Sequence, residues 1–332
     1  RRPAEPSPTP WLPWMVEAIL ADDNPFARAA ARSSAAALPG ALREAAREDL
    51  RRLQALATLA AGQLAQALQR QGMPWPEGLL SGPPQLAVES PGCRPQRQRV
   101  QALHEAFARG RDWGELVDEL ADYHRAAGWG LLGRFGVLRW QGSLVGVHRP
   151  DPVRLEELVG YEAERGRVVA NTPRFVRGLP AHHLLLYGPR GTGKSATVKA
   201  LAHAFVDEGL RLVELARSQL AELPEVVRTL ARFPQRFVLF VDDLSFEESE
   251  GLQRELKAAL EGTVEQWPDN VVVYATSNRR HLVQERPSDD GLARPQDEIN
   301  ERISLADRFA VTVIFPAADQ ELYLRIVETL AR

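Results

Sequence analysis

Beyond residue 150, short apolar runs alternate with longer amphipathic stretches. The apolar runs lie at 183–187, 210–215, 237–241, 271–275 and 311–315. Helical patterning fills the segments at about 195–208, 218–233, 251–262 and 297–304. Strands that are apolar throughout and alternate with helices are typical of a parallel sheet covered on both faces. The pattern predicts an α/β core with a five-stranded parallel sheet.

The first 150 residues show a different, mainly helical pattern. Leucines recur on one broad face between residues 41 and 70, and a second helical pattern runs from 98 to about 127. A Pro/Gly-rich connector lies at 72–92, and 135–147 is typical of two strands joined by a turn. We therefore expect four parts: a disordered Pro-rich tail at 1–14, a mostly helical domain with a small strand pair at 15–150, the α/β core at 151–316, and a last helix at 317–332.

Composition narrows the class of protein without choosing a partner. Hydrophobic residues make up 44% of the chain and charged residues 26%, as in globular proteins. The net charge of -3 gives no general attraction to nucleic acid or to an anionic membrane. No apolar run approaches the ~18 residues of a bilayer span, so we expect no membrane partner. The single cysteine, Cys93, excludes an internal disulfide, and we expect a reducing, cytoplasmic setting.

One eight-residue segment carries the clearest chemistry. Residues 188–195, Gly-Pro-Arg-Gly-Thr-Gly-Lys-Ser, match the P-loop pattern at every fixed position, between an apolar strand and a helix. The glycines allow successive backbone N–H groups to point inward as a nest for an anion, which the helix N-terminus reinforces. The predicted ATP contacts are Gly188, Pro189, Arg190, Gly191, Thr192, Gly193, Lys194, Ser195 and Ala196. The alternative is a glycine-rich turn that binds nothing.

Within this loop, Lys194 and Ser195 have separate expected roles. Lys194 is expected to reach the β- and γ-phosphates from the exposed rim of the sheet, and the Ser195 hydroxyl to ligate Mg²⁺. Only three of the 41 basic residues are lysines. A lysine that remains in such an arginine-rich chain indicates a position where a compact ammonium is required.

Asp242 and Asp243 directly follow the apolar run at 237–241. A carboxylate at the carboxyl end of a neighbouring strand is where Mg²⁺ needs a ligand, commonly through water, so Asp242 is the predicted Walker B residue. The alternative is a pair of carboxylates that cap the next helix. For Glu247 and the glutamates after it, an acidic first helical turn is the simpler interpretation.

Spacing separates the classes of P-loop protein. Between Ser195 and Asp242 there is room for a helix, a complete strand and another helix. This spacing is typical of ATPases in which a further strand lies between the P-loop and Walker B strands and presents a polar residue to the γ-phosphate. The run at 271–275 supplies that strand, and Asn278 near its end is the predicted sensor. The alternative for Asn278 is a turn residue, and Thr276 and Ser277 are weaker sensor candidates.

Five blocks of sequence, taken in order, resemble one known family. The blocks are LVGYEAERGRVVANT, LLLYGPRGTGKS, VLFVDDLSFEE, VYATSNRRHL and ISLADRF. They cover about residues 151–315 and are similar to AAA+ ATPases, and within them to the bacterial family known as domain of unknown function 815. The resemblance implies an AAA+ fold, ATP and Mg²⁺ as cofactors, and a homo-oligomer, either a ring or a nucleotide-dependent assembly. It also implies that the helix at 317–332 is the first helix of a truncated lid.

The same resemblance assigns roles around the nucleotide. Val159, Gly160 and Tyr161 lie where the superfamily contacts adenine. Asp243 lies where AAA+ proteins usually carry a glutamate that polarises the attacking water. Aspartate is one methylene shorter than glutamate, and an Asp-Asp ending is similar to that of bacterial replication initiators of this group.

Arg308 is the predicted arginine finger, supplied to the next subunit from the block before the last strand. Arg302 is the second candidate, and the alternative for Arg308 is an ion pair with Asp307.

These features predict an ATPase that hydrolyses Mg-ATP to remodel or load an unidentified protein or nucleoprotein client. The alternative is a nucleotide-gated assembly switch or scaffold with negligible turnover. A small-molecule kinase would need an acceptor pocket over the P-loop, and no lid segment suggests one. The loop at 216–224 lacks the aromatic-hydrophobic pair of protein-threading AAA+ unfoldases, which makes threading less favoured.

The first 150 residues contain no recognisable catalytic group. His104 and His124 are interpreted as ordinary helix-surface histidines, and two arginine clusters as solvated helix faces rather than nucleic-acid contacts. The clusters are Arg43, Arg47, Arg51 and Arg52, and Arg94, Arg97 and Arg99. By position, we expect this domain to choose the client.

Overall fold

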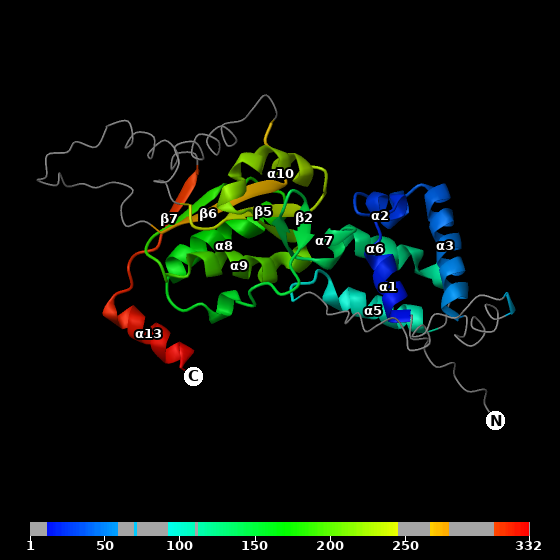
Figure 1. Cartoon of the computed structure of the whole chain (residues 1–332), viewed down its shortest axis with the longest axis horizontal. Helices are drawn as coiled ribbons and strands as arrows, with labels where there is room; N and C mark the ends of the chain where they lie inside the picture. Colours follow the sequence, from blue (N-terminus) through cyan, green and yellow to red (C-terminus); the bar gives the residue numbers. More distant parts are fainter. Residues whose placement is uncertain are drawn as a thin grey trace, which may run out of the picture. The chain divides into compact units, whose positions relative to one another are not determined.

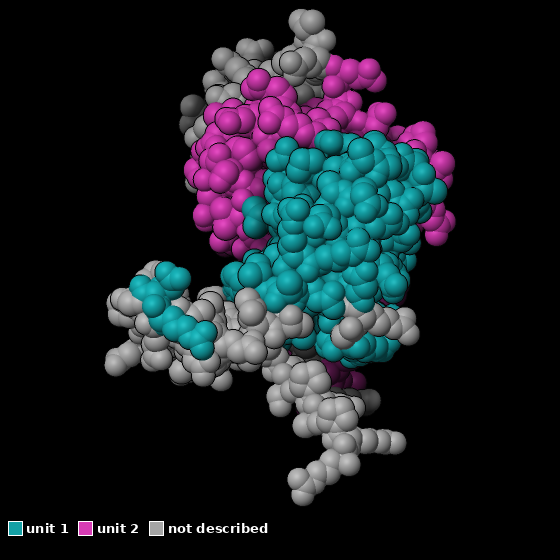
Figure 2. Space-filling view, turned by 90° about the vertical axis from the view of Figure 1, so that its right-hand side faces the viewer, with its two compact units in different colours: residues 1–134 teal, residues 135–332 magenta. Residues whose placement is uncertain are grey.

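The computed structural model describes residues 12–58, 70–71, 92–109, 112–244, 266–278 and 309–331. The chain divides into two compact units, residues 1–134 and residues 135–332 (Figure 2). The described part of the chain contains no helix that is long and apolar enough to cross a membrane. The predicted helices at 251–262 and 297–304 lie outside the described residues, as do residues 1–11 of the tail predicted at 1–14. Residues 12–14 of that tail belong to a helix.

The described part of the first unit is helical, as the sequence pattern predicts (Figure 1). Its α-helices are α1 (Leu12–Leu20), α2 (Pro25–Ala30), α3 (Gly40–Thr58), α5 (Arg97–Ala108), α6 (Val117–Ala127) and α7 (Leu131–Arg134). Two 3-10 turns accompany them, η1 (Ala35–Ala37) and η3 (Trp113–Leu116). Their apolar faces form one core, with Leu20, Phe107 and Tyr123 fully or nearly fully buried.

A buried ion pair ties α1 to the segment that leads into α5. Arg94 donates to both carboxylate oxygens of Glu17, at 2.8 and 2.9 Å, and both side chains are buried. The interpretation of Arg94 as part of a solvated helix face is therefore wrong, because its guanidinium is paired inside the unit. His104 Nε2 also lies 2.8 Å from Glu17 Oε1. Burial alone raises the pKa of Glu17, but the hydrogen bonds from His104 and Arg94 outweigh burial and hold that pKa at about 2. The carboxylate therefore contributes to stability at neutral pH.

The interpretation of His124 as a surface residue is wrong. Its side chain is buried on α6, and Nδ1 donates to the carbonyl of Gly128 at 3.1 Å. Burial lowers the pKa of His124 to about 4, so the imidazole is neutral at pH 7. The position shares the apolar stripe of α6 with Leu120 and Ala127, which is why it faces the core.

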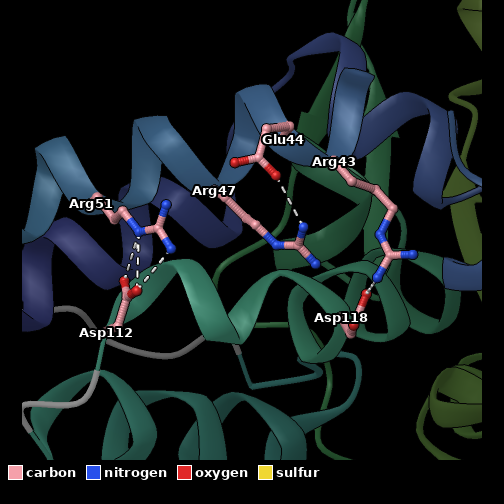
Figure 3. Close-up of polar contacts among 6 residues, drawn as sticks. All are labelled: Arg43, Glu44, Arg47, Arg51, Asp112 and Asp118. Atoms are coloured by element: carbon pink, nitrogen blue, oxygen red, sulfur yellow. Dashed lines mark hydrogen bonds and ion pairs between the residues drawn. The ribbon is translucent and has the colours of Figure 1, made fainter. Parts of the chain in front are cut away.

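The arginines of α3 are paired with carboxylates of their own unit (Figure 3). Arg51 reaches Asp112 just before η3 at 3.0 Å, and Arg43 reaches Asp118 on α6 at 2.5 Å. The remaining pairs are Arg47 with Glu44, and Arg52 with Glu48 and Asp49. Exposed pairs of this kind contribute little to stability, because water screens their charges. The pairing agrees with a solvated helix face.

The second unit is built on one sheet of seven strands (Figure 1). The strands are β1 (Val137–Trp140), β2 (Leu144–Gly146), β3 (Leu184–Tyr187), β4 (Leu210–Glu214), β5 (Arg236–Val241), β6 (Val271–Ser277) and β7 (Val311–Ile314). Their order is β2-β1-β4-β5-β6-β3-β7. The five predicted strands are all present and pair in parallel. The fold class is confirmed, and β6 lies between β5 and β3 as the spacing argument predicts.

The predicted count of five strands is wrong because the strand pair at 135–147 joins this sheet. β1 pairs in parallel with β4, with Val137 opposite Leu212, and β2 pairs with β1 in the antiparallel direction. The two strands belong to the compact unit that begins at Phe135, rather than to the helical domain. Only the long-range pairing of β1 with β4 reveals this assignment.

Helices cover both faces of the sheet (Figure 1). The helical elements are η4 (Leu155–Glu157), α8 (Glu162–Val176), α9 (Lys194–Phe205), η5 (Val206–Glu208), η6 (Arg217–Glu222), α10 (Leu223–Leu230) and α13 (Gln320–Leu330). α9 and α10 lie on opposite faces, because the chain moves in opposite directions along the sheet before and after β4. All residues of β3 and β6 are buried, which accounts for their continuous apolar runs.

Candidate nucleotide-binding site

Glycine is required at the first position of the P-loop. Gly188 has φ +146°, and a Cβ atom on it would lie 2.0 Å from the carbonyl oxygen of Phe315, at the end of β7. Its N–H donates to the carbonyl of Ser277 at 3.2 Å. Gly191 and Gly193 also have positive φ, at +80° and +81°. The loop is thus held between the ends of β6 and β7 in a conformation that L residues rarely adopt.

Lys194 lies inside the loop rather than on an exposed rim, so that part of the sequence prediction is wrong. Its Nζ donates to the carbonyls of Gly188 and Pro189, at 2.8 and 2.7 Å, and its side chain is buried. Burial lowers the pKa of Lys194, and the charges of Asp242 and Asp243 oppose that shift. An ammonium in this position lies next to the backbone nest of the phosphate loop.

The structure brings Ser195 and Asp242 together. Ser195 lies in the first turn of α9, and Asp242 directly follows β5. The Ser195 hydroxyl donates to Asp242 Oδ1 at 2.6 Å, and the Thr276 hydroxyl on β6 donates to the same oxygen at 2.6 Å. Mg²⁺ in nucleotide sites takes one or two protein oxygens and fills its octahedron with phosphates and water. The hydroxyl and carboxylate fit this requirement, and the described residues contain no cluster of three or more His, Cys, Asp or Glu that would hold a metal on its own.

Asp243 and Asn278 also meet, at the ends of neighbouring strands. Asn278 Nδ2 donates to Asp243 Oδ1 at 2.6 Å, and Arg190 Nη2 of the P-loop lies 3.8 Å from Asp243 Oδ2. Asp243 has φ +54°, an uncommon conformation for a residue other than glycine. Its carboxylate is half-exposed, which allows contact with solvent or a bound molecule. The predicted water-polarising residue and the predicted sensor are thus direct partners.

The predicted adenine-contacting segment lies against the end of β7 and the start of α13. Gly160 and Tyr161 both have positive φ, at +75° and +55°. The Tyr161 hydroxyl donates to the carbonyl of Pro316 at 3.0 Å, and its ring centroid lies 5.5 Å from that of Phe315. A Cβ atom on Gly160 would meet Leu322 of α13 at 2.2 Å.

Phe315 therefore links two predicted parts of the site, since its carbonyl faces Gly188 and its ring faces Tyr161. The sequence predicts Phe315 only as the last residue of a strand. The predicted arginine finger Arg308, its alternative Arg302 and the acidic residue Glu247 lie outside the described residues.

The inserted strand β6, the P-loop between β3 and α9, and the acidic pair after β5 define an AAA+ P-loop protein. Within that class, the chain belongs to the family described as "Protein of unknown function (DUF815)", whose family model matches residues 134–332. That match contains every predicted site residue.

The chain is also similar to curated proteins and to solved structures over part of its length. The chain is 30% identical to a 26S proteasome regulatory subunit 6B homolog of Dictyostelium discoideum, over 44% of this chain and 39% of that protein. It is 28% identical to a probable replication factor C subunit 5 of Caenorhabditis elegans, over 39% of this chain and 38% of that protein. The chain thus spans about two fifths of the length of these relatives. A solved Thermotoga maritima RuvB Holliday junction branch migration motor matches 54% of this chain and 53% of its own, with 18% identity and a TM-score of 0.36.

Proposed function

We propose that this protein binds Mg-ATP at residues 188–196, hydrolyses it, and uses the cycle to remodel or load a protein or nucleoprotein partner. The observation that carries the proposal is the convergence of Ser195, Asp242, Asp243 and Asn278 beside the P-loop. They form two hydrogen-bonded pairs that the Thr276 hydroxyl links. These side chains come from the start of one helix and the ends of two strands. P-loop ATPases hold the γ-phosphate and its metal at such a place. The similarity to a replication factor C subunit and to a 26S proteasome regulatory subunit supports the AAA+ class on which the proposal rests.

Each side chain has a definite task in this proposal. The backbone N–H groups of the P-loop and the Lys194 ammonium bind the phosphates. Ser195 and Asp242 hold Mg²⁺, which when bound neutralises charge on the phosphate oxygens. Asp243 accepts a proton from the attacking water. The water oxygen bonds to the γ-phosphorus while the bond between that phosphorus and the β-phosphate oxygen breaks. Asn278 orients the Asp243 carboxylate through the hydrogen bond at 2.6 Å.

The partner is proposed to be engaged without threading. The loop after β4 folds as η6, with Leu220 buried, and Glu222 accepts a hydrogen bond from Trp140 Nε1 at 2.5 Å. A loop held in this way and lacking an aromatic tip is poorly suited to gripping a moving polypeptide. The relatives include subunits of replication factor C and of the 26S proteasome, which supports action as one subunit of an assembly.

The proposed assembly is a homo-oligomer in a reducing, cytoplasmic setting, completed by Arg308 from the neighbouring subunit. We propose α13 as the first helix of the lid, with Leu322 lying over Gly160. The proposed adenine contacts are Val159, Gly160 and Tyr161.

A nucleotide-gated switch remains the second candidate, and one observation favours it. Asn278 donates a hydrogen bond to one carboxylate oxygen of Asp243. Asp243 is also one methylene shorter than the glutamate that AAA+ proteins usually carry at the position of the water-polarising residue. Steady-state phosphate release, measured together with light scattering at equal ATP concentration, separates the two functions. Phosphate release by the wild type that is lost in Lys194→Ala supports hydrolysis. ATP-dependent assembly without phosphate release supports the switch and overturns the ATPase proposal.

A further inference from the structure

Thr276 makes contacts with three successive residues of the Walker B segment. It lies on β6 and is 1% exposed. Its Oγ1 accepts a hydrogen bond from the N–H of Asp243 at 2.9 Å and donates to Asp242 Oδ1 at 2.6 Å. Its carbonyl accepts the N–H of Leu244 at 2.7 Å.

The directions of these hydrogen bonds follow from the chemistry of a hydroxyl. A threonine hydroxyl has one proton, and the peptide N–H of Asp243 can only donate to it. The hydroxyl proton is therefore available to the carboxylate of Asp242. One oxygen atom thus connects the proposed metal ligand with the backbone of the proposed base.

The contact to Asp243 matters because that residue has an unusual backbone. A non-glycine residue at φ +54° is conformationally strained, and such strain persists only where surrounding contacts determine the conformation. Thr276 Oγ1 accepts the N–H of this residue. The same conformation places the Asp243 carboxylate within reach of Asn278.

We propose that Thr276 is a positioning residue that couples the metal side of the site to its water side, through one hydroxyl shared by Asp242 and Asp243. The proposal rests on the proposed function and assigns to Thr276 a role distinct from that of a sensor, because its hydroxyl contacts the two acidic residues. Valine has nearly the shape of threonine but no hydroxyl, whereas serine keeps the hydroxyl. The two substitutions therefore separate the hydrogen bonds from the packing.

The test compares Thr276→Val, Thr276→Ser and the control Thr172→Val in the full chain. Thr172 is also fully buried, and its hydroxyl bonds the carbonyl of Val168 and the hydroxyl of Tyr274. We measure phosphate release against Mg²⁺ concentration, and the affinity for fluorescent mant-ATP with and without Mg²⁺. Thermal unfolding of each variant records any general loss of stability.

Thr276→Val is expected to keep its metal-free mant-ATP affinity within about twofold, because the P-loop is intact. Its turnover should fall on the order of tenfold to a hundredfold, as for loss of a hydrogen bond to a charged group, and half-saturation with Mg²⁺ should require more metal. Thr276→Ser should retain most of the turnover. Thr172→Val should also retain it, even if its unfolding temperature falls as much as that of Thr276→Val. Wild-type turnover and Mg²⁺ dependence in Thr276→Val would overturn the proposal, as would equal losses in the valine and serine variants.

The outcome is distinguishable from failure of the proposed function. If the wild-type protein binds mant-ATP but releases no phosphate, hydrolysis is overturned while Thr276 is still tested by the Mg²⁺-dependent gain in affinity. That gain should then be lost in Thr276→Val and kept in Thr276→Ser, and its retention in both would overturn the coupling. A wild-type protein that binds no nucleotide overturns both proposals.

Discussion

The substitution Gly188→Ala tests the geometry of the P-loop most sharply, because a matched control lies three residues away. At Gly188 a Cβ atom would lie 2.0 Å from a backbone oxygen of Phe315, so the strand end or the loop must move by about 1.4 Å or more to reach an ordinary contact. At Gly191 a Cβ atom meets nothing within 4 Å, and only the positive φ of +80° opposes the substitution.

The difference between the two variants isolates the clash. Gly191→Ala should cost about 1–2 kcal/mol of unfolding free energy, the strain of a left-handed L residue. Gly188→Ala adds an overpacking cost of about 1–3 kcal/mol to a similar backbone strain. In a unit of this size, each kcal/mol lowers the unfolding temperature by roughly 2–4 °C. Gly188→Ala should therefore unfold several degrees below Gly191→Ala.

The assay is thermal unfolding by circular dichroism, paired with mant-ATP titration below the transition. Gly188→Ala is expected to lose most of its nucleotide affinity, because the loop cannot keep its position between β6 and β7. If Gly188→Ala is as stable as Gly191→Ala and binds mant-ATP like the wild type, the close approach of Phe315 and Gly188 does not exist in solution.

Other predictions address separate parts of the chain. Lys194→Ala should reduce mant-ATP affinity at least tenfold (~1.4 kcal/mol) by fluorescence titration, and an unchanged affinity would refute the role of its ammonium. Arg308→Ala alone should bind ATP yet release little phosphate, and mixing it with Lys194→Ala under demonstrated subunit exchange should restore some release; a mixture as inactive as its parts would show that Arg308 does not act in trans. Glu17 has a pKa of about 2 in the folded protein against 4.5 ordinarily, so its contribution, about 3 kcal/mol, is fully present above pH 4.5 and is lost as the pH falls toward 2. Urea unfolding across this range should therefore show Glu17→Gln less stable than the wild type at pH 7, with the gap narrowing below pH 4.5; a constant gap would refute the assignment.

The sequence predicts the core sheet well because β3, β4, β5 and β6 are buried on both faces along nearly their whole length and are therefore apolar in themselves. It does not predict where β1 and β2 belong, since their partner β4 is distant in the chain and the pairing leaves no local pattern. The predicted strand at 271–275 also stops two residues early. β6 continues through Thr276 and Ser277. The sequence pattern therefore presents Thr276 only as a weak sensor candidate, although it lies inside the strand.

The arrangement of the candidate site is predictable from sequence where one short motif fixes the local geometry. The P-loop, the acidic pair and Asn278 fall into that group, because strand ends of a parallel sheet meet at one edge. The burial of Lys194 and the hydrogen bonds of Thr276 depend on the positions of carbonyls and carboxylates from other segments. The burial of His124 depends on which side of α6 meets the core. Such properties are set by packing and are not visible in residue type alone.

Asp243 is proposed to activate water for hydrolysis of ATP bound at this P-loop. Steady-state phosphate release by wild type and Asp243→Asn tests this role, with both proteins saturated with Mg-ATP as verified by mant-ATP titration. We expect Mg²⁺-dependent release by the wild type and a loss of roughly a hundredfold or more (~2.7 kcal/mol) in Asp243→Asn, with nucleotide affinity retained. Equal rates in the two proteins would place the base elsewhere, and the absence of release from a nucleotide-saturated wild type would contradict the ATPase assignment.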